Sequence, residues 1–541
     1  MPLVFGEKDS IQKATITFLP MIPLNPSTLD CVYSTLKFIE SHALLNNRTP
    51  ICTFDQAIWW KALEVLNSPQ CDLGVFVFML GDFHMMSFLG CFGYVMGGTG
   101  IEDAFAEVYA ENTIPHILSG SAVTRATRAH ELNSEALYAH LLEYCISSQD
   151  TEEIKALIES SINEGYSLKQ LAKSEALTTI TAKIEKKRED FADNKTALLW
   201  LEYLRMTGIL KRFIRADRIE NWDAHLSAIQ DMMPYFAACG HNNYLKSVWI
   251  FLQNMESLKR NNPVVYSKFK EGFFTIRRRD KKVWGGLPCD LVIEQTLMRS
   301  LKSRGGLSRG TGFKEVQRNT YIYSRPICAM VSDKVQELAG ISFCTTKNHL
   351  VTNSSRPARV HRDNEDCSKL IQFYRENNPF SQRDGNPINL VTGVVADDSV
   401  NVFDAVGIGQ RIISSMAGVT VSAHTFKVSS YAVNMKKKIK ITNGGESVLV
   451  DNALLFQRLT AIALCNNSID VDIKSIFSYS LCAYPASLAS SQTQLLKANK
   501  PKLLEDFLPF SSPSFFGLQV VHMLWLTEDF LSKIKCFGRK T

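Results

Sequence analysis

The sequence has few glycines and prolines, 29 and 18 among 541 residues, too few for a collagen-like or low-complexity chain. Its 13 cysteines include no pair at Cys-x₂₋₄-Cys spacing, so a zinc ribbon and a thioredoxin-like motif are absent. Hydrophobic residues make up 45% of the chain, enough apolar material for a folded core. Disordered, fibrous and disulfide-scaffold classes are therefore excluded.

The sequence also lacks a strong excess of one charge. The net charge of +6 permits a nucleic-acid partner without demanding one. The N-terminus has no basic segment followed by an apolar run, which argues against a signal peptide. The most apolar stretch, residues 73–101, is interrupted by Asp82 and His84, so a strand, a turn and a buried helix fit it better than a membrane span. We expect an intracellular protein, in the nucleus or cytoplasm, with no membrane partner.

Common catalytic motifs are missing as well. There is no Gly-x-Ser-x-Gly sequence for a serine nucleophile, and the glycines of residues 97–100 are not followed by the Lys-Ser/Thr of a P-loop. Any chemistry must therefore come from another set of side chains.

The first part of the chain predicts a βαβ unit with parallel strands. A β-prone run at residues 50–55 and an apolar run at 73–80 are each followed by a helical pattern, at 56–66 and 84–96. From about residue 134 the pattern becomes helical. The predicted fold class is α/β with a large all-α portion. We expect five regions: an α/β unit with the candidate site (1–133), a helical domain or insertion (134–275), a basic loop and helix returning to the α/β unit (276–345), a loop-rich linker (346–400) and a mixed α/β C-terminal region (401–541).

Carboxylates follow both predicted strands. Asp55 and Asp82 stand at the carboxyl ends, the edge of an open parallel sheet where sites form. Glu294 is the candidate third carboxylate, and Asp290, one helical turn earlier, is a possible substitute. Three such groups bind Mg²⁺ or Mn²⁺ for phosphoryl transfer, because hard cations prefer oxygen ligands. His84 is a further candidate ligand.

Structural roles remain open for the same residues. Asp55 and Asp82 both precede predicted helices, where aspartate is a common N-cap. His84 is also consistent with a histidine of the core, the more common role of such a residue.

Basic side chains flank Glu294 and indicate a surface that holds a nucleic-acid backbone. The alternative is a solvated charged face. The candidate nucleic-acid-binding residues are Arg277, Arg278, Arg279, Lys281, Lys282, Arg299, Lys302, Arg304 and Arg309.

Four segments carry a resemblance to a known family: 53–62 (TFDQAIWWKA), 80–90 (LGDFHMMSFLG), 290–307 and 475–488. They resemble a large, uncharacterised family of invertebrate proteins that is expanded in many genomes. Its more distant similarity to fungal transposon-associated proteins implies descent from a mobile element. The resemblance extends over residues 14–500 and fades after about 505, as it would at a truncated or misjoined end.

The resemblance implies, by fold-level analogy, an RNase H-like sheet interrupted by a helical insertion. Only 27 residues separate Asp55 from Asp82, however, where such a core places two further strands. We therefore expect a transposable-element-derived protein that acts on nucleic acid, with DNA the favoured partner. If it is active, Asp55, Asp82 and Glu294 would hold Mg²⁺ or Mn²⁺. The alternatives are a non-catalytic nucleic-acid-binding protein and a helical scaffold, either domesticated or an inactive remnant. The sequence leaves the oligomeric state open.

Overall fold

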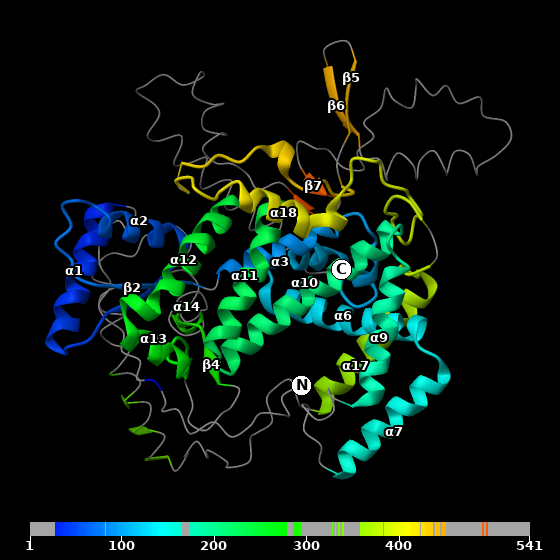
Figure 1. Ribbon diagram of the computed structural model, residues 1–541, viewed down its shortest axis with the longest axis horizontal. Coiled ribbons are helices and arrows are strands. Elements are labelled where there is room, and N and C mark those ends of the chain that lie inside the picture. Colours follow the sequence, from blue (N-terminus) through cyan, green and yellow to red (C-terminus); the bar gives the residue numbers. More distant parts are fainter. Residues whose placement is uncertain are drawn as a thin grey trace. The chain divides into compact units, whose positions relative to one another are not determined.

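A computed structural model of the protein shows two parallel strands joined by a helix, which form a βαβ unit near the start of the chain (Figure 1). β1 (Ile51–Phe54) pairs with β2 (Val77–Leu80) in parallel, from Ile51 opposite Val77 to Phe54 opposite Leu80. The predicted βαβ arrangement is thus confirmed. The structure describes residues 14, 28–81, 83–164, 174–277, 285–293, 327, 330–331, 334–335, 338–339, 357–381, 384–421, 423–436, 439–443, 446–450, 489–491 and 494–495.

Most of the described elements are helices. The predicted α/β class with a large helical part is confirmed. In chain order the helices are α1 (Leu29–Leu45), α2 (Gln56–Leu66), α3 (Phe83–Val95), α4 (Ile101–Ala106), α5 (Ile114–Leu118), α6 (Val123–Cys145), α7 (Ser148–Glu164), α9 (Glu175–Glu189), α10 (Lys195–Arg218), α11 (Trp222–Ala238), α12 (Asn242–Asn261), α13 (Pro263–Lys270), α14 (Cys289–Ile293), α17 (Pro357–Glu376) and α18 (Ala405–Ser414).

The remaining strands form short antiparallel pairs. They are β3 (Ile276–Arg277) with β4 (Gly286–Leu287), β5 (Ile439–Asn443) with β6 (Glu446–Val450), and β7 (Ala489–Ser491) with β8 (Gln494–Leu495). Residues 1–456 cluster as one unit, and residues 457–541, which contain β7 and β8, cluster as another.

The core of the first unit is built around α3. This helix is apolar on all sides, and Phe88, Leu89, Phe92 and Val95 are fully buried. A helix without a polar face must be enclosed by other elements. α3 contacts α5, α6, α10 and α11, and α10, α11 and α12 lie side by side around it (Figure 1). The helical block is therefore packed on the βαβ unit, and α6 runs across the predicted boundary at residue 133.

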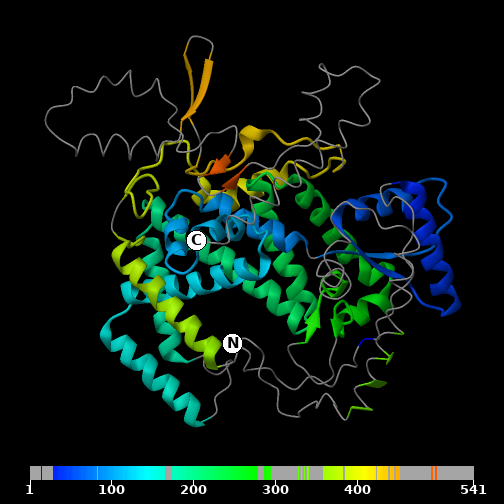
Figure 2. The same ribbon diagram turned by 180° about the vertical axis from the view of Figure 1, so that it is seen from behind.

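The predicted loop-rich linker at 346–400 is wrong at its centre, where residues 357–376 form α17. Leu370, Phe373 and Tyr374 are its buried residues, at i, i+3 and i+4, and they make the narrow apolar stripe of a surface helix. Figure 2 shows this helix, in yellow-green, lying across α6. The Tyr374 hydroxyl donates to Asn133 Oδ1 of α6 at 2.8 Å, and Asn133 Nδ2 donates to the hydroxyl of Tyr203 on α10 at 3.1 Å.

Alanine substitutions at two helical glycines test this packing, because we expect them to change the free energy of unfolding in opposite directions. A methyl group on Gly409 of α18 would lie 2.0 Å from the carbonyl oxygen of Pro234 on α11, whereas one on Gly208 of α10 has no atom within 4 Å. We expect Gly409→Ala to lower the free energy of unfolding by about 1–3 kcal/mol, because backbone must move. Gly208→Ala should raise it by about 0.5–1 kcal/mol. Urea unfolding of both variants measures this, and equal effects would contradict the close α11–α18 contact.

Candidate active site

The carboxyl ends of β1 and β2 meet at one edge of the sheet. The Gly81 amide donates to the carbonyl oxygen of Phe54 at 2.9 Å, so the two chains remain paired one residue beyond the strands. Asp55 follows β1 directly. Asp82 follows Gly81 but lies outside the described residues, as does Glu294.

Asp55 is the N-cap of α2. Its Oδ1 accepts a hydrogen bond from the Ile58 amide at 3.0 Å, which satisfies one of the unpaired donors at the start of the helix. Burial, and then the charge of Asp55, raises the pKa of Tyr244. Asp55 therefore has the N-cap role that the sequence left open, and it has that role at the position predicted for a metal ligand.

Asp290 is brought to the same edge from 235 residues along the chain. A methyl group on Gly81 would lie 2.9 Å from Asp290 Oδ2 and 3.1 Å from the carbonyl oxygen of Phe54. The carboxylate of Asp290 therefore lies against the carboxyl ends of both strands, and α14 contacts β1. One Asp290 oxygen, Oδ1, also accepts from the Leu291 amide at 2.9 Å.

His84 begins the buried helix beside this edge. Its Nδ1 lies 3.0 Å from the carbonyl oxygen of Gly81, so Nδ1 carries the proton and donates. Burial, reinforced by nearby His225, lowers the pKa of His84 to about 3, so the ring is neutral near pH 7. Nε2 is buried without a hydrogen-bond partner in the described part of the chain. A neutral imidazole nitrogen of this kind fits either a core histidine or a ligand.

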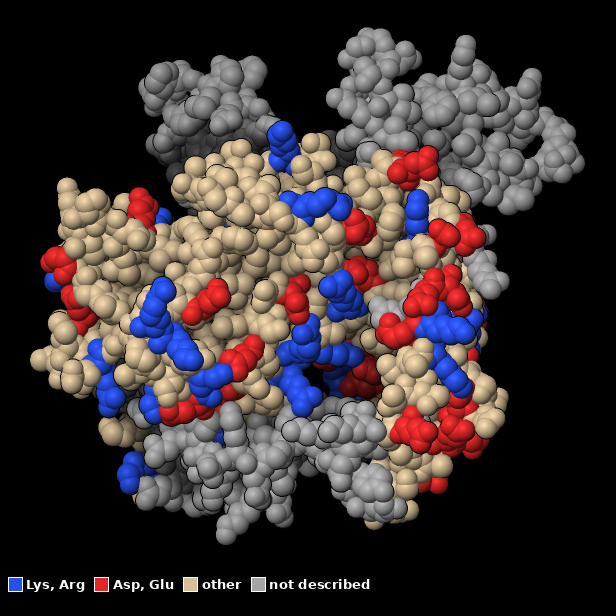
Figure 3. Space-filling view, in the orientation of Figure 1, with Lys and Arg blue, Asp and Glu red and all other residues tan. Residues whose placement is uncertain are grey.

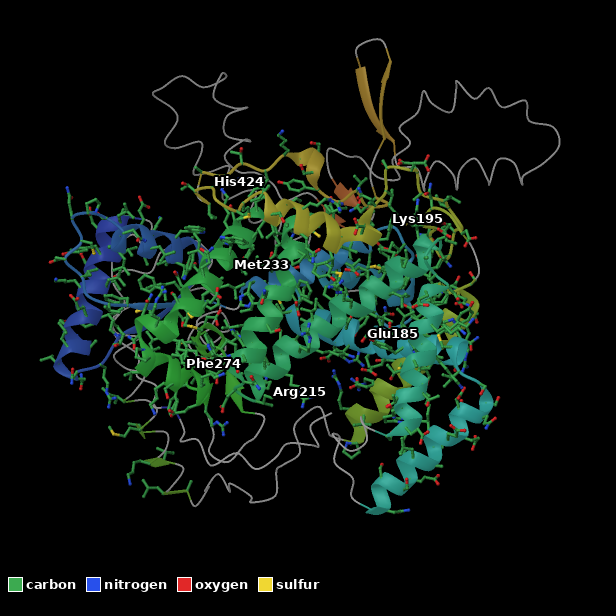
Figure 4. The ribbon with its side chains drawn as sticks, in the orientation of Figure 1. Glu185, Lys195, Arg215, Met233, Phe274 and His424 are labelled. Carbon is green, nitrogen blue, oxygen red and sulfur yellow. The ribbon has the colours of Figure 1, made fainter. Side chains whose placement is uncertain are left out.

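A buried Asp–His pair lies next to Asp290, and the sequence analysis missed it. Asp217 Oδ1 is 2.6 Å from His225 Nδ1, and each side chain is 6% exposed. The pair borders a cavity of about 20 Å³, room for about one water molecule. The other residues that line this cavity are Thr53, Met79, Leu80, Phe274 (labelled in Figure 4), Thr275, Pro288, Cys289 and Asp290.

No sequence signal marks Asp217 and His225. They lie at the end of α10 and the start of α11, eight residues apart, and only the tertiary fold places them beside residues 288–290. Burial also raises the pKa of the Cys289 thiol at this cavity, so the thiol is protonated near pH 7.

Arg277 is not available to a nucleic acid in this structure. It is 6% exposed, and its guanidinium forms a two-armed ion pair with the Glu220 carboxylate, with Nε donating to Oε1 at 2.7 Å. A buried guanidinium already paired in this way has no exposed face for a phosphate, so its position gives no support to the predicted contact of Arg277 with nucleic acid. The other eight predicted basic residues lie outside the described residues: Arg278, Arg279, Lys281, Lys282, Arg299, Lys302, Arg304 and Arg309.

A different group of basic side chains lies on the surface. On the face shown in Figure 3, Lys and Arg gather near the centre, where the labels of Figure 4 place Arg215. Arg205, Arg212 and Arg215 are all exposed on α10, at i, i+7 and i+10, which is one face of the helix. Arg212 pairs with Asp231 at 2.6 Å, and Arg205 lies 4.0 Å from Glu202, so acidic neighbours offset part of this charge.

The described residues hold no group of three or more His, Cys, Asp and Glu side chains arranged to bind a metal ion. Within those residues, Asp55 and Asp290 each have one carboxylate oxygen that accepts from a backbone amide, at 3.0 and 2.9 Å. Among the described helices, none has both the length and the apolar character needed to cross a membrane.

The fold and this edge define a predominantly helical α/β protein with a polar cluster at the carboxyl ends of a parallel strand pair. Residues 3–480 match a family described as a domain of unknown function (DUF8702), and the chain belongs to that family. No curated protein and no solved structure matches the chain.

The buried histidines predict an acid-sensitive fold. Burial lowers the pKa of both His84 and His130 to about 3, below the ordinary value of 6.5. The unfolded chain binds these protons first, so the stabilisation is complete above pH 6.5 and is lost as pH falls from 6.5 toward 3. We expect each histidine to cost about 1.4 kcal/mol per pH unit in that window.

Urea unfolding at pH 7.5, 6.5 and 5.5 measures this loss. His130→Phe should reduce the loss by the share of one histidine. Phenylalanine fits this position because the ring lies between Phe92 and Phe105, and the Tyr203 hydroxyl keeps Asn133 as a partner. Stability that is unchanged or higher at pH 5.5 would contradict the neutral buried state of these rings.

Proposed function

We propose that this protein is a transposable-element-derived protein that acts on nucleic acid, with DNA the favoured substrate, and cleaves a phosphodiester bond with Mg²⁺ or Mn²⁺. The observation that carries the proposal is the position of Asp290. A carboxylate from a distant part of the chain lies at the carboxyl ends of two parallel strands, directly against the residue that precedes Asp82. An RNase H-like arrangement of the sheet is part of the proposal.

In this proposal Asp290 would hold a divalent cation together with the carboxylates predicted from sequence, Asp55, Asp82 and Glu294. A bound cation would supply an activated water and charge stabilisation for the leaving oxygen. His84 would help to position Gly81, the residue before Asp82, through its hydrogen bond to the carbonyl oxygen of Gly81.

The Asp217–His225 pair is suited to orienting a water molecule. Asp217 Oδ1 lies 2.6 Å from Nδ1 of His225, which fixes the position of the imidazole ring. Because both side chains line the same small cavity as Asp290, the pair would hydrogen-bond a water in that cavity.

A second candidate is a non-catalytic nucleic-acid-binding protein. The Asp55 carboxylate is already engaged as a helix cap, and Arg205, Arg212 and Arg215 share one exposed face of α10. Such a protein binds phosphates through these arginines, and its affinity falls steeply with salt.

A cleavage assay on the full chain separates the two candidates. Labelled double-stranded DNA, single-stranded DNA and RNA are incubated with the protein in Mg²⁺, in Mn²⁺ or in EDTA. We expect cleavage that requires the metal and falls at least about 100-fold in Asp290→Asn, the scale seen when one stabilising group is removed. Glu256→Gln, an exposed carboxylate on α12, is the matched control and should cleave like the unaltered protein.

Thermal unfolding of Asp290→Asn checks that the variant is folded. Cleavage that persists in EDTA, or that is equal in Asp290→Asn, would overturn the proposed enzyme. Salt-sensitive binding without cleavage would favour the second candidate.

A further inference from the structure

A separate pocket of about 540 Å³ lies at the start of α12. This volume is in the range of small-molecule sites. It is formed by the first residue of α2, by α3, by the turn after α5 and by the junction of α11 and α12. The lining residues are Gln56, Met86, Ser87, Ser119, Gly240, His241, Asn242, Asn243 and Tyr244.

The pocket lies beside the candidate active site. Gln56 is the residue after Asp55, and the Asp55 charge contributes to the raised pKa of Tyr244. Gln56 and Ser87 both belong to segments that carry the family resemblance, and neither has a part in the proposed metal chemistry. A ligand in this pocket would therefore lie next to the carboxyl end of β1.

The lining is polar without being charged. The described residues around the pocket supply three side-chain amides, two serine hydroxyls and a tyrosine, and they include no Asp, Glu, Lys or Arg. Burial lowers the pKa of His241, so this ring is neutral near pH 7. A charged group placed here would lack a partner of opposite sign among these residues, so the lining favours a neutral ligand with several donors and acceptors.

Two amides are held in fixed orientations. Gln56 Nε2 donates to Ser247 Oγ at 2.7 Å, which leaves Oε1 as the acceptor of that side chain. Asn242 Nδ2 donates to the Tyr431 hydroxyl at 2.6 Å, while Asn242 Oδ1 is buried and has no hydrogen-bond partner in the described part of the chain. Each of these two amides therefore has a fixed donor and a fixed acceptor end.

Ser87 and His241 add a further hydrogen-bonding pair. Ser87 Oγ lies 2.5 Å from His241 Nδ1, and the serine is 9% exposed. Whichever atom carries the shared proton, the pair presents one donor and one acceptor beyond that bond. Tyr244 and His241 supply aromatic rings at the same wall.

We propose that this pocket binds an unpaired nucleobase next to the phosphodiester that is cleaved. The choice of a nucleobase rests on the proposed function. A base is neutral and planar and carries adjacent donors and acceptors, which glutamine and asparagine amides pair with in two-point contacts. Aromatic rings stack on its faces, and enzymes that act on nucleic acid hold unstacked bases in such pockets.

Binding of free nucleosides to the full chain, in EDTA, tests the pocket without any cleavage. The probes are the four deoxynucleosides, with deoxyribose as the control ligand, measured by calorimetry. We expect at least one nucleoside to bind, deoxyribose not to bind, and Gln56→Met and Ser87→Ala each to weaken binding about tenfold. Gln410→Met, on the exposed face of α18, is the matched control and should bind unchanged.

Asn243→Ala provides a second variant if Gln56→Met fails to fold, because Asn243 is exposed and lines the same pocket. Equal binding by the variants and the unaltered protein, or no preference for nucleosides over deoxyribose, would overturn the proposal. If metal-dependent cleavage is present while nucleosides do not bind, only the pocket proposal fails. If nucleosides bind in the expected pattern and cleavage is absent, the enzyme proposal fails and the pocket stands.

Discussion

The burial of α3 is the constraint on which the rest of the structure depends. This helix has no polar face, and it follows a strand whose four residues are all buried. Water must be kept from every side of it, and the two-stranded sheet has too little area to do so. The later helices α10 and α11 supply the missing cover. The end of α10 and the start of α11 border the small cavity at the strand edge, and α14 places Asp290 at the same edge.

The same burial accounts for the polar groups at that edge. A polar side chain next to α3 is taken out of water, so it needs a partner. His84 is hydrogen-bonded to the carbonyl oxygen of Gly81. Asp217 pairs with His225, and Glu220 forms an ion pair with Arg277. Such buried pairs add little net stability, since removing each charge from water is costly. Their value for locating a functional site is that they hold polar side chains in fixed positions.

Local patterns predicted the βαβ unit well. The strands after residues 50 and 73 and the helices that follow them depend on short apolar runs and on breaks in the sequence, and these signals are local. Asp55 shows the limit of such signals, since a cap and a metal ligand require the same residue at the same place. α17 was missed because charged residues outnumber its three buried ones, so the narrow apolar stripe of Leu370, Phe373 and Tyr374 was hidden.

Long-range partners could not be predicted in this way. Arg277 was assigned to nucleic acid because it begins a basic run, and its partner Glu220 is 57 residues earlier. Asp217 and His225 carry no motif, and their importance comes from lying beside Asp290 across a small cavity. Asp290 itself was predicted as a substitute ligand, and its position at the strand edge comes with the contact of α14 with β1.

Manganese-soaked crystals give the most direct test of a cation site at this edge. Anomalous scattering locates Mn²⁺ independently of any substrate. We expect a peak at the carboxyl ends of β1 and β2, about 2 Å from an Asp290 carboxylate oxygen. Crystals that take up Mn²⁺ elsewhere, or bind it at this edge without an Asp290 oxygen, would contradict the proposed metal-dependent chemistry.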